Sequence, residues 1–140
     1  MPTITLTTTM TRPPESPNNR LHWSATNRIR REVRWELMVR ARGAGAPTGL
    51  DHVTVTVHHR PADSRGIWDD DNRLAGCKAI FDALHGHSGR NTGPAWPIVA
   101  DDSPGHMTQR ALGHPPAKGQ PAALWVELAW TATDEEDIPC

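Results

Sequence analysis

The run Val53-Thr54-Val55-Thr56-Val57-His58 contains three valines that alternate with polar residues. Because successive side chains of a β-strand point to opposite faces, this alternation predicts a strand with one buried face. Residues 60–66 follow with proline, aspartate, serine and glycine, which favour a turn. A helical pattern begins after the turn. This stretch therefore predicts a strand followed by a turn and a helix, and the other elements of the fold are predicted around them.

The helix after this turn is predicted to start around Asp70 to Asn72 and to run to about His85. Its apolar residues recur at intervals of three and four, and they are Leu74, Cys77, Ile80, Phe81 and Leu84. Aspartate and asparagine suit the first turn of a helix, because free backbone N–H groups there favour negative charge.

The N-terminal part of the chain predicts a strand and a second helix. Residues 3–10 alternate apolar side chains with threonines, which is typical of a half-buried strand. Ser24 is a suitable N-cap for a helix that ends at Gly43. The apolar stripe of this helix recurs every four residues, at Ile29, Val33 and Leu37.

Two further strands are predicted toward the C-terminus, a short one at residues 107–112 and a final one at residues 124–130. The predicted order is strand, helix, strand, helix, short strand, strand. This order predicts an α+β fold, in which two main α-helices pack on one face of a small mixed β-sheet. Residues 1–133 are expected to form a single domain, and residues 134–140 an acidic, disordered tail.

Length and composition narrow the class of protein. A chain of 140 residues suffices for one domain with a modest core. No apolar run approaches the roughly 18 residues that span a bilayer, and the N-terminus lacks the pattern of a signal peptide. Cys77 falls inside a predicted helix and Cys140 is the last residue, so a disulfide between them is not expected. A reducing cytoplasm is the simplest location.

Charge is unevenly distributed although the net charge is only −1. The first fifty residues are rich in arginine, whereas the acids concentrate later in the chain. Such a basic half could bind a phosphate backbone, or it could form the salt-bridged outer face of a soluble helix. The candidate DNA contacts are Arg20, His22, Arg28, Arg31, Arg65 and Lys118.

An acidic cluster is the strongest candidate site. Asp69 and Asp71 lie two residues apart, so in extended backbone their side chains point to the same side. Asp102 could supply a third carboxylate from another loop. Carboxylates packed together repel each other, and either solvent or a bound divalent cation has to offset them. Mg²⁺ suits such an oxygen-lined site, with Mn²⁺ as an alternative.

Lys78 has two interpretations. Helical side chains lean toward the N-terminus, so its ammonium could point back toward Asp71 and hold a scissile phosphate. Alternatively, Lys78 pairs with Asp82 at i, i+4 on the surface. An EF-hand beginning at Asp69 is excluded because its sixth position is Leu74. His85 and His87 could form half of a zinc site, but no pair of cysteines is nearby.

Several motifs occur together in one order: Asn18-Asn19-Arg20-Leu21-His22-Trp23, Asp69-x-Asp71-Asn72, Lys78-Ala79-Ile80-Phe81-Asp82-Ala83-Leu84 and Asp101-Asp102. This set resembles the RusA-type Holliday junction resolvases of bacteria and phages. The resemblance spans roughly residues 3–131. It departs from the shorter form of the motif by three extra residues between Asp71 and Lys78, which place the lysine about 4.5 Å further along a helix.

The resemblance implies a RusA-like fold and a homodimeric, Mg²⁺-dependent endonuclease. Such enzymes bind four-way DNA junctions and introduce paired, symmetry-related nicks during recombination and repair. The residues that match the metal-binding aspartates are Asp69, Asp71 and Asp102, and Lys78 matches the essential lysine. Asn72 and Asp101 are expected to support the site. Two alternatives remain open: a broader nuclease for flaps or other branched DNA, and a catalytically silent DNA-binding relative.

Overall fold

The structure, a computed structural model, describes residues 1–15, 23–85 and 94–131. Two predictions fall outside these residues. They are the DNA contacts proposed for Arg20 and His22 and the disordered tail proposed for residues 134–140.

The centre of the fold is a mixed sheet of four strands, in the order β1-β4-β2-β3. The strands are β1 (Thr3–Thr7), β2 (Val53–Arg60), β3 (Met107–Gly113) and β4 (Ala123–Ala129). β4 pairs antiparallel with both β1 and β2, whereas β3 runs parallel to β2 at the edge. The predicted mixed sheet is therefore confirmed, although β1 ends three residues earlier than the predicted strand.

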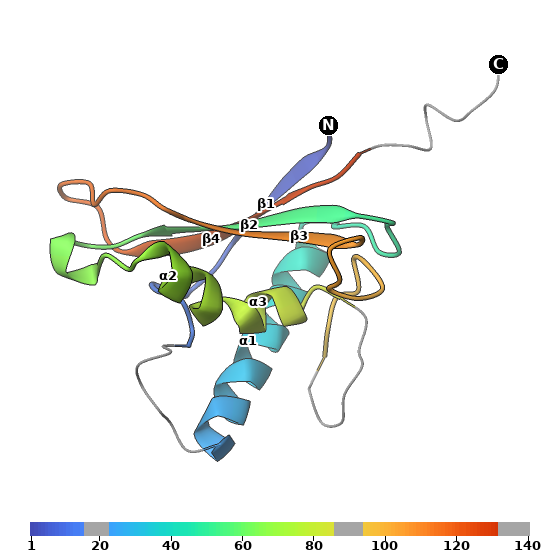
Figure 1. The fold of residues 1–140 in the computed structure, drawn as a ribbon, viewed down its shortest axis with the longest axis horizontal. Helices are drawn as coiled ribbons and strands as arrows, with labels where there is room; N and C mark the ends of the chain where they lie inside the picture. The colour runs from blue at the N-terminus through green and yellow to red at the C-terminus, as the bar shows by residue number, and fades with distance from the viewer. Residues whose placement is uncertain (16–22, 86–93, 132–140) are drawn as a thin grey trace.

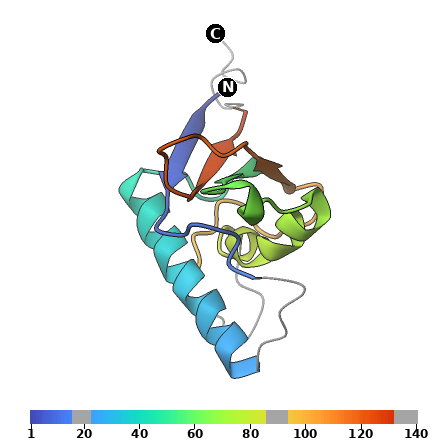
Figure 2. The same cartoon turned by 90° about the vertical axis from the view of Figure 1, so that its left-hand side faces the viewer.

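The helices all lie on one face of this sheet, as Figure 1 shows. They are α1 (Trp23–Gly43), α2 (Asp70–Gly76) and the short α3 (Lys78–Asp82), and one 3-10 turn, η1 (Ser64–Gly66), precedes α2. Viewed from the side, α1 and the α2–α3 pair lie next to each other beneath the sheet (Figure 2). This arrangement confirms the α+β class. No helix in the described ranges is long and apolar enough to cross a bilayer.

The second helix differs from the prediction, because it is divided at Cys77. The backbone of Cys77 has φ −96° and ψ 6°, outside regular helix geometry. The preceding Gly76 packs directly against the segment before α1, where Glu15 N–H donates to the Gly76 carbonyl at 3.1 Å. Leu74 was predicted to face the core, but it is 40% exposed. The close approach at Gly76 therefore ends α2 and redirects the chain into α3.

The core lies between the sheet and the helices. α1 contributes the buried Val33 and Leu37, as its spacing predicts, and β2 contributes its alternating valines. From α3, Ile80 and Phe81 are completely or almost completely buried. The apolar stripe of α1 thus fixes which side of this helix faces the sheet and which side faces solvent.

The chain between α3 and β3 returns along the end of α3. Trp96 N–H donates to the Ala83 carbonyl at 2.8 Å, and Ile98 N–H donates to the Leu84 carbonyl at 3.2 Å. An isolated parallel bridge joins His85 to Val99. These bonds hold the following acidic residues beside the end of α3.

Candidate metal centre

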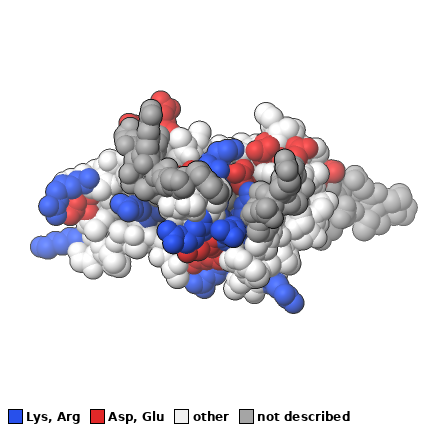
Figure 3. Space-filling model, turned by 90° about the horizontal axis from the view of Figure 1, so that it is seen from below, with Lys and Arg blue, Asp and Glu red and all other residues white. Residues whose placement is uncertain are grey.

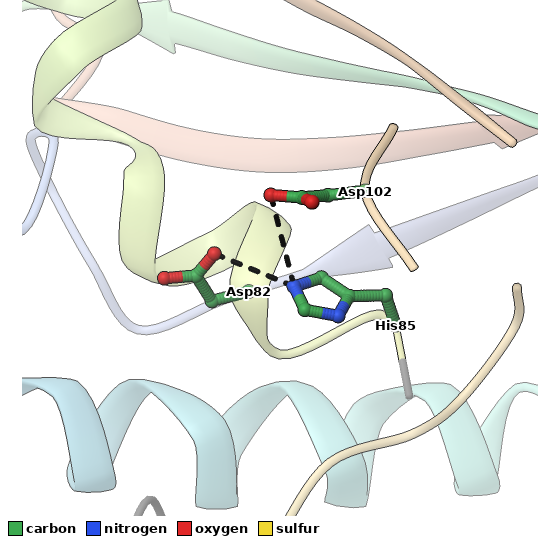
Figure 4. A group of neighbouring side chains, drawn as sticks. All are labelled: Asp82, His85 and Asp102. Atoms are coloured by element: carbon green, nitrogen blue, oxygen red, sulfur yellow. Dashed lines mark hydrogen bonds and ion pairs between the residues drawn. The ribbon is translucent and has the colours of Figure 1, made fainter. Parts of the chain in front are cut away.

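Three side chains converge where α3 ends. Asp82 is the last residue of α3, His85 follows it, and Asp102 comes from the segment before β3 (Figure 4). His85 Nε2 lies 3.5 Å from Asp82 Oδ1 and 4.0 Å from Asp102 Oδ2. One ligand atom from each residue lies within 4.8 Å of the other two. The group therefore has the composition and the spacing of a candidate metal centre.

Local structure explains this convergence. Phe81 and Leu84 are buried in the core, and the Asp82 and His85 side chains beside them lie 3.5 Å apart at the end of α3. The side chains of Asp82 and His85 are only 17% and 11% exposed, whereas that of Asp102 is 44% exposed. The group is thus shielded on the helix side and open on the Asp102 side, so a ligand could enter there.

Lys78 lies at the edge of this group. Its Nζ is 3.7 Å from Asp82 Oδ1, the atom that also faces His85. This is the i, i+4 pair with Asp82 that the sequence offered as one interpretation of the lysine. The distance between the two charged atoms is long for an ion pair, and the Lys78 side chain is 61% exposed. The amine is therefore free to contact an anion that binds from solvent. Lys78 and Asp102 therefore each approach Asp82.

Asp69 and Asp71 do not belong to this group. Among the described side chains, the only cluster of three or more His, Cys, Asp or Glu residues with this spacing is Asp82, His85 and Asp102. Asp71 also lies within the first turn of α2 rather than in extended backbone, because the helix begins at Asp70. The premise that Asp69 and Asp71 point to one side in a strand-like segment is therefore wrong.

Asp69 is the N-cap of α2. Its Oδ1 accepts from Asn72 N–H at 2.8 Å, and its Oδ2 accepts from Asn72 Nδ2 at 2.9 Å. Asn72 therefore holds the Asp69 carboxylate at the start of α2. Asp71 is exposed in the same turn.

Asp101 shapes the turn before β3. Its carboxylate accepts from Ser103 N–H at 2.9 Å, and His106 Nε2 lies 3.9 Å away. The hydrogen bonds from Ser103 hold the pKa of Asp101 below its ordinary value. Asp101 thus supports the backbone next to Asp102 and does not itself belong to the three-residue group.

The candidate DNA contacts are dispersed. Arg28 and Arg31 are exposed on α1, and Lys118 is exposed in the turn between β3 and β4. Arg65 is exposed but pairs with Asp63 at 3.0 Å. On the helix-bearing side of the molecule, basic side chains lie in the middle and at the left, and acidic side chains are interspersed among them (Figure 3).

The chemistry of the three-residue group suits a divalent cation. Two carboxylates around one imidazole carry negative charge that Lys78 and solvent offset in part and that a bound divalent cation could offset further. Carboxylates suit Mg²⁺ and Mn²⁺, whereas an imidazole is a ligand for transition metals rather than for Mg²⁺. The separations of 3.5 and 4.0 Å exceed the roughly 3 Å between neighbouring ligands of an octahedral ion. Binding therefore requires the side chains to move inward by about 1 Å.

Sequence reasoning missed Asp82 and His85 as candidate ligands. Asp82 was interpreted as a partner of Lys78, and a zinc site of His85 with His87, which lies outside the described residues, was set aside because no pair of cysteines is nearby. A signal was present in the spacing, because residues three apart on a helix lie on the same face. A carboxylate and a histidine at i, i+3 are also the pattern that helical metal sites use.

A second group of rings lies on the sheet, away from this centre. His58 Nδ1 and His114 Nε2 are 2.8 Å apart, and His58 Nε2 lies 2.9 Å from Glu127 Oε1. Trp125 is nearly parallel to both imidazoles. Each imidazole nitrogen of His58 has a partner, so this cluster is a satisfied polar network.

No protein-family model matches the sequence, and no curated protein matches it either. The resemblance to the RusA-type resolvases therefore rests on the motif residues alone, and it stays a prediction.

Proposed function

We propose that this chain is a divalent-cation-dependent endonuclease for branched DNA, of the Holliday junction resolvase class. The observation that carries the proposal is the convergence of Asp82, His85 and Asp102, with Lys78 beside them. Two of these four residues, Lys78 and Asp102, are among the four that the motif resemblance assigns to the site, the others being Asp69 and Asp71. Agreement between the motif and an independent geometric feature is the support for this function.

Asp82, His85 and Asp102 would hold the cation. When bound, such an ion polarises a phosphoryl oxygen and lowers the pKa of a coordinated water. The imidazole in the ligand set leads us to expect stronger binding of Mn²⁺ than of Mg²⁺. This preference distinguishes the group from an all-carboxylate site.

Lys78 would contact the phosphate. Its amine already lies at the edge of the carboxylate group, and its side chain extends into solvent. A bound phosphodiester would offer it a second, stronger partner than the long contact with Asp82, because charge-assisted bonds to phosphate are short and strong. Lys78 would thus hold the reacting phosphate and stabilise the charge that develops on it.

The exposed Arg28 and Arg31 on α1 would contact flanking DNA backbone. Contacts of this kind position the protein without reading the base sequence, as expected for an enzyme that recognises DNA shape. They also make binding weaker as salt concentration rises.

Three carboxylate variants test the proposal on a synthetic four-way junction. Asp82→Asn and Asp102→Asn should each abolish cation-dependent cleavage while junction binding, measured by gel shift, persists. Asp51→Asn, which removes an exposed carboxylate elsewhere, is the matched control and should cleave at the wild-type rate. Cleavage by Asp102→Asn at the wild-type rate would contradict the proposal.

Asp71→Asn decides between the two ligand sets. Loss of cleavage in Asp71→Asn together with normal cleavage in Asp82→Asn would favour the set Asp69, Asp71 and Asp102 that the motif implies. Loss in Asp82→Asn alone would favour the group that converges in the fold. Rates on four-way, three-way and flap DNA, measured with the wild-type protein, then distinguish a resolvase from a broader branched-DNA nuclease.

A further inference from the structure

A pocket of about 200 Å³ lies at the end of the sheet opposite the three-residue group. His59 and Gly113, at the carboxyl ends of the parallel strands β2 and β3, line it together with residues of α2. Asp102 precedes β3, so the two sites lie at opposite ends of this strand pair. In Figure 1, η1 and the start of α2 lie beneath this end of the sheet, at the left. Ligands of sheets with parallel strands commonly bind beyond the carboxyl ends of those strands, so the position suits a binding site.

Arg73 brings a buried positive charge to the pocket. Its side chain is only 6% exposed, and its guanidinium packs against Gly113, where a Cβ would overlap it. Nη2 donates to the Trp68 carbonyl at 2.6 Å, and Nη1 donates to Asp70 Oδ1 at 2.7 Å. Nε, by contrast, is buried and has no hydrogen-bond partner among the described residues. A buried N–H without an acceptor is unfavourable, so the guanidinium retains a donor that an anionic ligand would satisfy.

The surroundings of Arg73 favour an anion. Of the described residues that line the pocket, Asp70 is the only acid, and its side chain is 94% exposed. Solvent therefore screens the attraction between Asp70 and the arginine. Pro61, Trp68 and Pro115 supply apolar walls, which exclude water and strengthen the attraction between Arg73 and a ligand inside.

His114 also lines the pocket, and a chain of hydrogen bonds fixes its tautomer. Glu127 Oε1 lies 2.9 Å from His58 Nε2, and His58 Nδ1 lies 2.8 Å from His114 Nε2. A carboxylate only accepts, so a neutral His58 donates from Nε2 to Glu127 and accepts at Nδ1 from His114. The lone pair of a neutral His114 is then on Nδ1, which has no partner among the described residues. Glu127 and His58 thus make His114 Nδ1 an acceptor.

We propose that this pocket binds a phosphate monoester group, with Arg73 and His114 as its two contacts. One oxygen would accept from Arg73, and the protonated oxygen would donate to His114 Nδ1. An anion that also carries a proton satisfies both contacts. A phosphate monoester meets this condition near neutral pH, because its second pKa is about 6. A phosphodiester and a sulfate ion carry no such proton, and neither does a carboxylate.

The protonation of His114 agrees with this assignment. Burial lowers its pKa, and His58, Arg60 and Arg73 act in the same direction. The free protein therefore holds the imidazole neutral at pH 7, which is the form that accepts a proton from the ligand.

The site goes beyond the proposed nuclease function and does not depend on it. None of its residues belongs to the three-residue group or pairs with Lys78. The same chemistry occurs in inorganic phosphate and at the phosphorylated end of a DNA strand, and the test below distinguishes these two sources.

An NMR titration of the isotopically labelled full chain tests the ligand class. At about pH 6.5, methyl phosphate should shift the indole N–H signal of Trp68 with a Kd of about 1 mM or lower. Dimethyl phosphate, which has no ionisable proton, and sulfate should each bind at least about tenfold more weakly. An unchanged spectrum with methyl phosphate at about 10 mM, or equal affinity for dimethyl phosphate, overturns the inference.

Matched variants test the two contacts. Arg73→Gln removes the charge, and His114→Gln removes the Nδ1 acceptor but keeps an amide that can donate to His58. Each should weaken binding of methyl phosphate at least about tenfold. Arg110→Gln and His52→Gln, at exposed positions outside the pocket, should bind like the wild type. Wild-type affinity in His114→Gln contradicts the proposal.

Glu127→Gln tests the pocket even if Arg73→Gln does not fold. The Glu127 side chain is 42% exposed and does not line the pocket, so the substitution should leave the fold intact. An amide can donate as well as accept, so it no longer fixes the tautomers of His58 and His114. The preference for methyl phosphate over sulfate should therefore decrease several-fold, which a purely structural role of Glu127 would not cause. An unchanged preference excludes the hydrogen-bond chain as its origin.

Competition identifies the source of the phosphate. Displacement of methyl phosphate by a short single-stranded oligonucleotide with a 5′-phosphate, but not by the same strand with a 5′-hydroxyl, supports a strand end as the ligand. Displacement by inorganic phosphate but by neither strand supports free phosphate. Displacement by both strands shows that a backbone phosphodiester binds, which overturns the proposal. Asp102→Asn should bind methyl phosphate like the wild type, so failure of the nuclease proposal and failure of this one can be told apart.

Discussion

His85 Nε2 lies 4.0 Å from Asp102 Oδ2, although the two residues belong to separate segments of the chain. The bridge between His85 and Val99 brings them together, because it anchors the segment that carries Asp102 beside the end of α3. The metal proposal depends on this approach, and it can be tested without any DNA.

We expect His85→Ala to weaken Mn²⁺ binding by at least about tenfold, since it removes the nitrogen ligand that favours this ion. Isothermal titration calorimetry on the folded protein measures the affinity. His106→Ala is the control, because His106 faces Asp101 and not the three-residue group. Equal affinity in wild type and His85→Ala would show that the imidazole is no ligand.

Gly76→Ala should destabilise the fold by about 1–3 kcal/mol, which is typical of overpacking. A Cβ at this position would collide with the Glu15 backbone oxygen and come within 2.9 Å of Pro13 and Trp68. Denaturant unfolding measures the change. Gly105→Ala is the matched control, because a Cβ there meets nothing within 4 Å, and it should leave the unfolding midpoint nearly unchanged.

Stability should decrease as the pH falls from about 7 to 5. Burial lowers the pKa of His114 below its ordinary value of 6.5, with His58, Arg60 and Arg73 acting in the same direction. Burial, with a smaller effect from Arg73, lowers the pKa of His59 as well. The unfolded chain therefore binds protons at these imidazoles more readily than the folded chain. Their contribution to stability is complete above pH 6.5 and is lost as the pH falls below it.

The measurement is the denaturant midpoint at a series of pH values. One imidazole of this kind contributes a slope of at most about 1.4 kcal/mol per pH unit. His114→Gln removes one titrating group and should flatten the dependence between pH 7 and 5. Hydrogen bonds lower the pKa values of Asp63 and Asp101. These two aspartates therefore change the stability only below about pH 4, outside the range from pH 7 to 5. An unchanged slope in His114→Gln would exclude it as a cause.

The thiol of Cys77 should resist alkylation in the native protein. Burial raises its pKa to about 12, so almost no thiolate is present at pH 8 and reagents have no access. In a Cys140→Ser background, mass spectrometry should detect iodoacetamide labelling of Cys77 only after denaturant is added. Rapid labelling of the folded chain would contradict the burial of this residue.

Local patterns were enough to predict most elements of this fold. The valines of β2 and the apolar residues at every fourth position of α1 each mark the buried face of one element. The elements can therefore be recognised from the sequence alone. The division of the second helix at Cys77 depends on the contact between Gly76 and residues 13–15, which no local pattern contains. The glycine within a helical pattern was the one available signal, because glycine lowers helix stability.

The candidate site was predictable in part. Lys78 and Asp102 were selected from the sequence, and each of them approaches Asp82 in the fold. His85 was not selected as a partner of Asp102, because their approach depends on a chain return that is held by backbone hydrogen bonds. Asp69 was predicted as a ligand; in the fold one of its carboxylate oxygens caps α2 and the other accepts from the side-chain amide of Asn72. A motif can therefore identify chemically suitable residues without revealing which of them meet.

The position of β4 in the sheet has a consequence for biosynthesis. This strand is the last to leave the ribosome, yet it lies between β1 and β2 and pairs with both. Until residues 123–129 emerge, β1 has no neighbour and β2 exposes one open edge, which is a template for pairing with other chains. We therefore expect nascent chains in which β4 has not yet emerged to aggregate through these open edges.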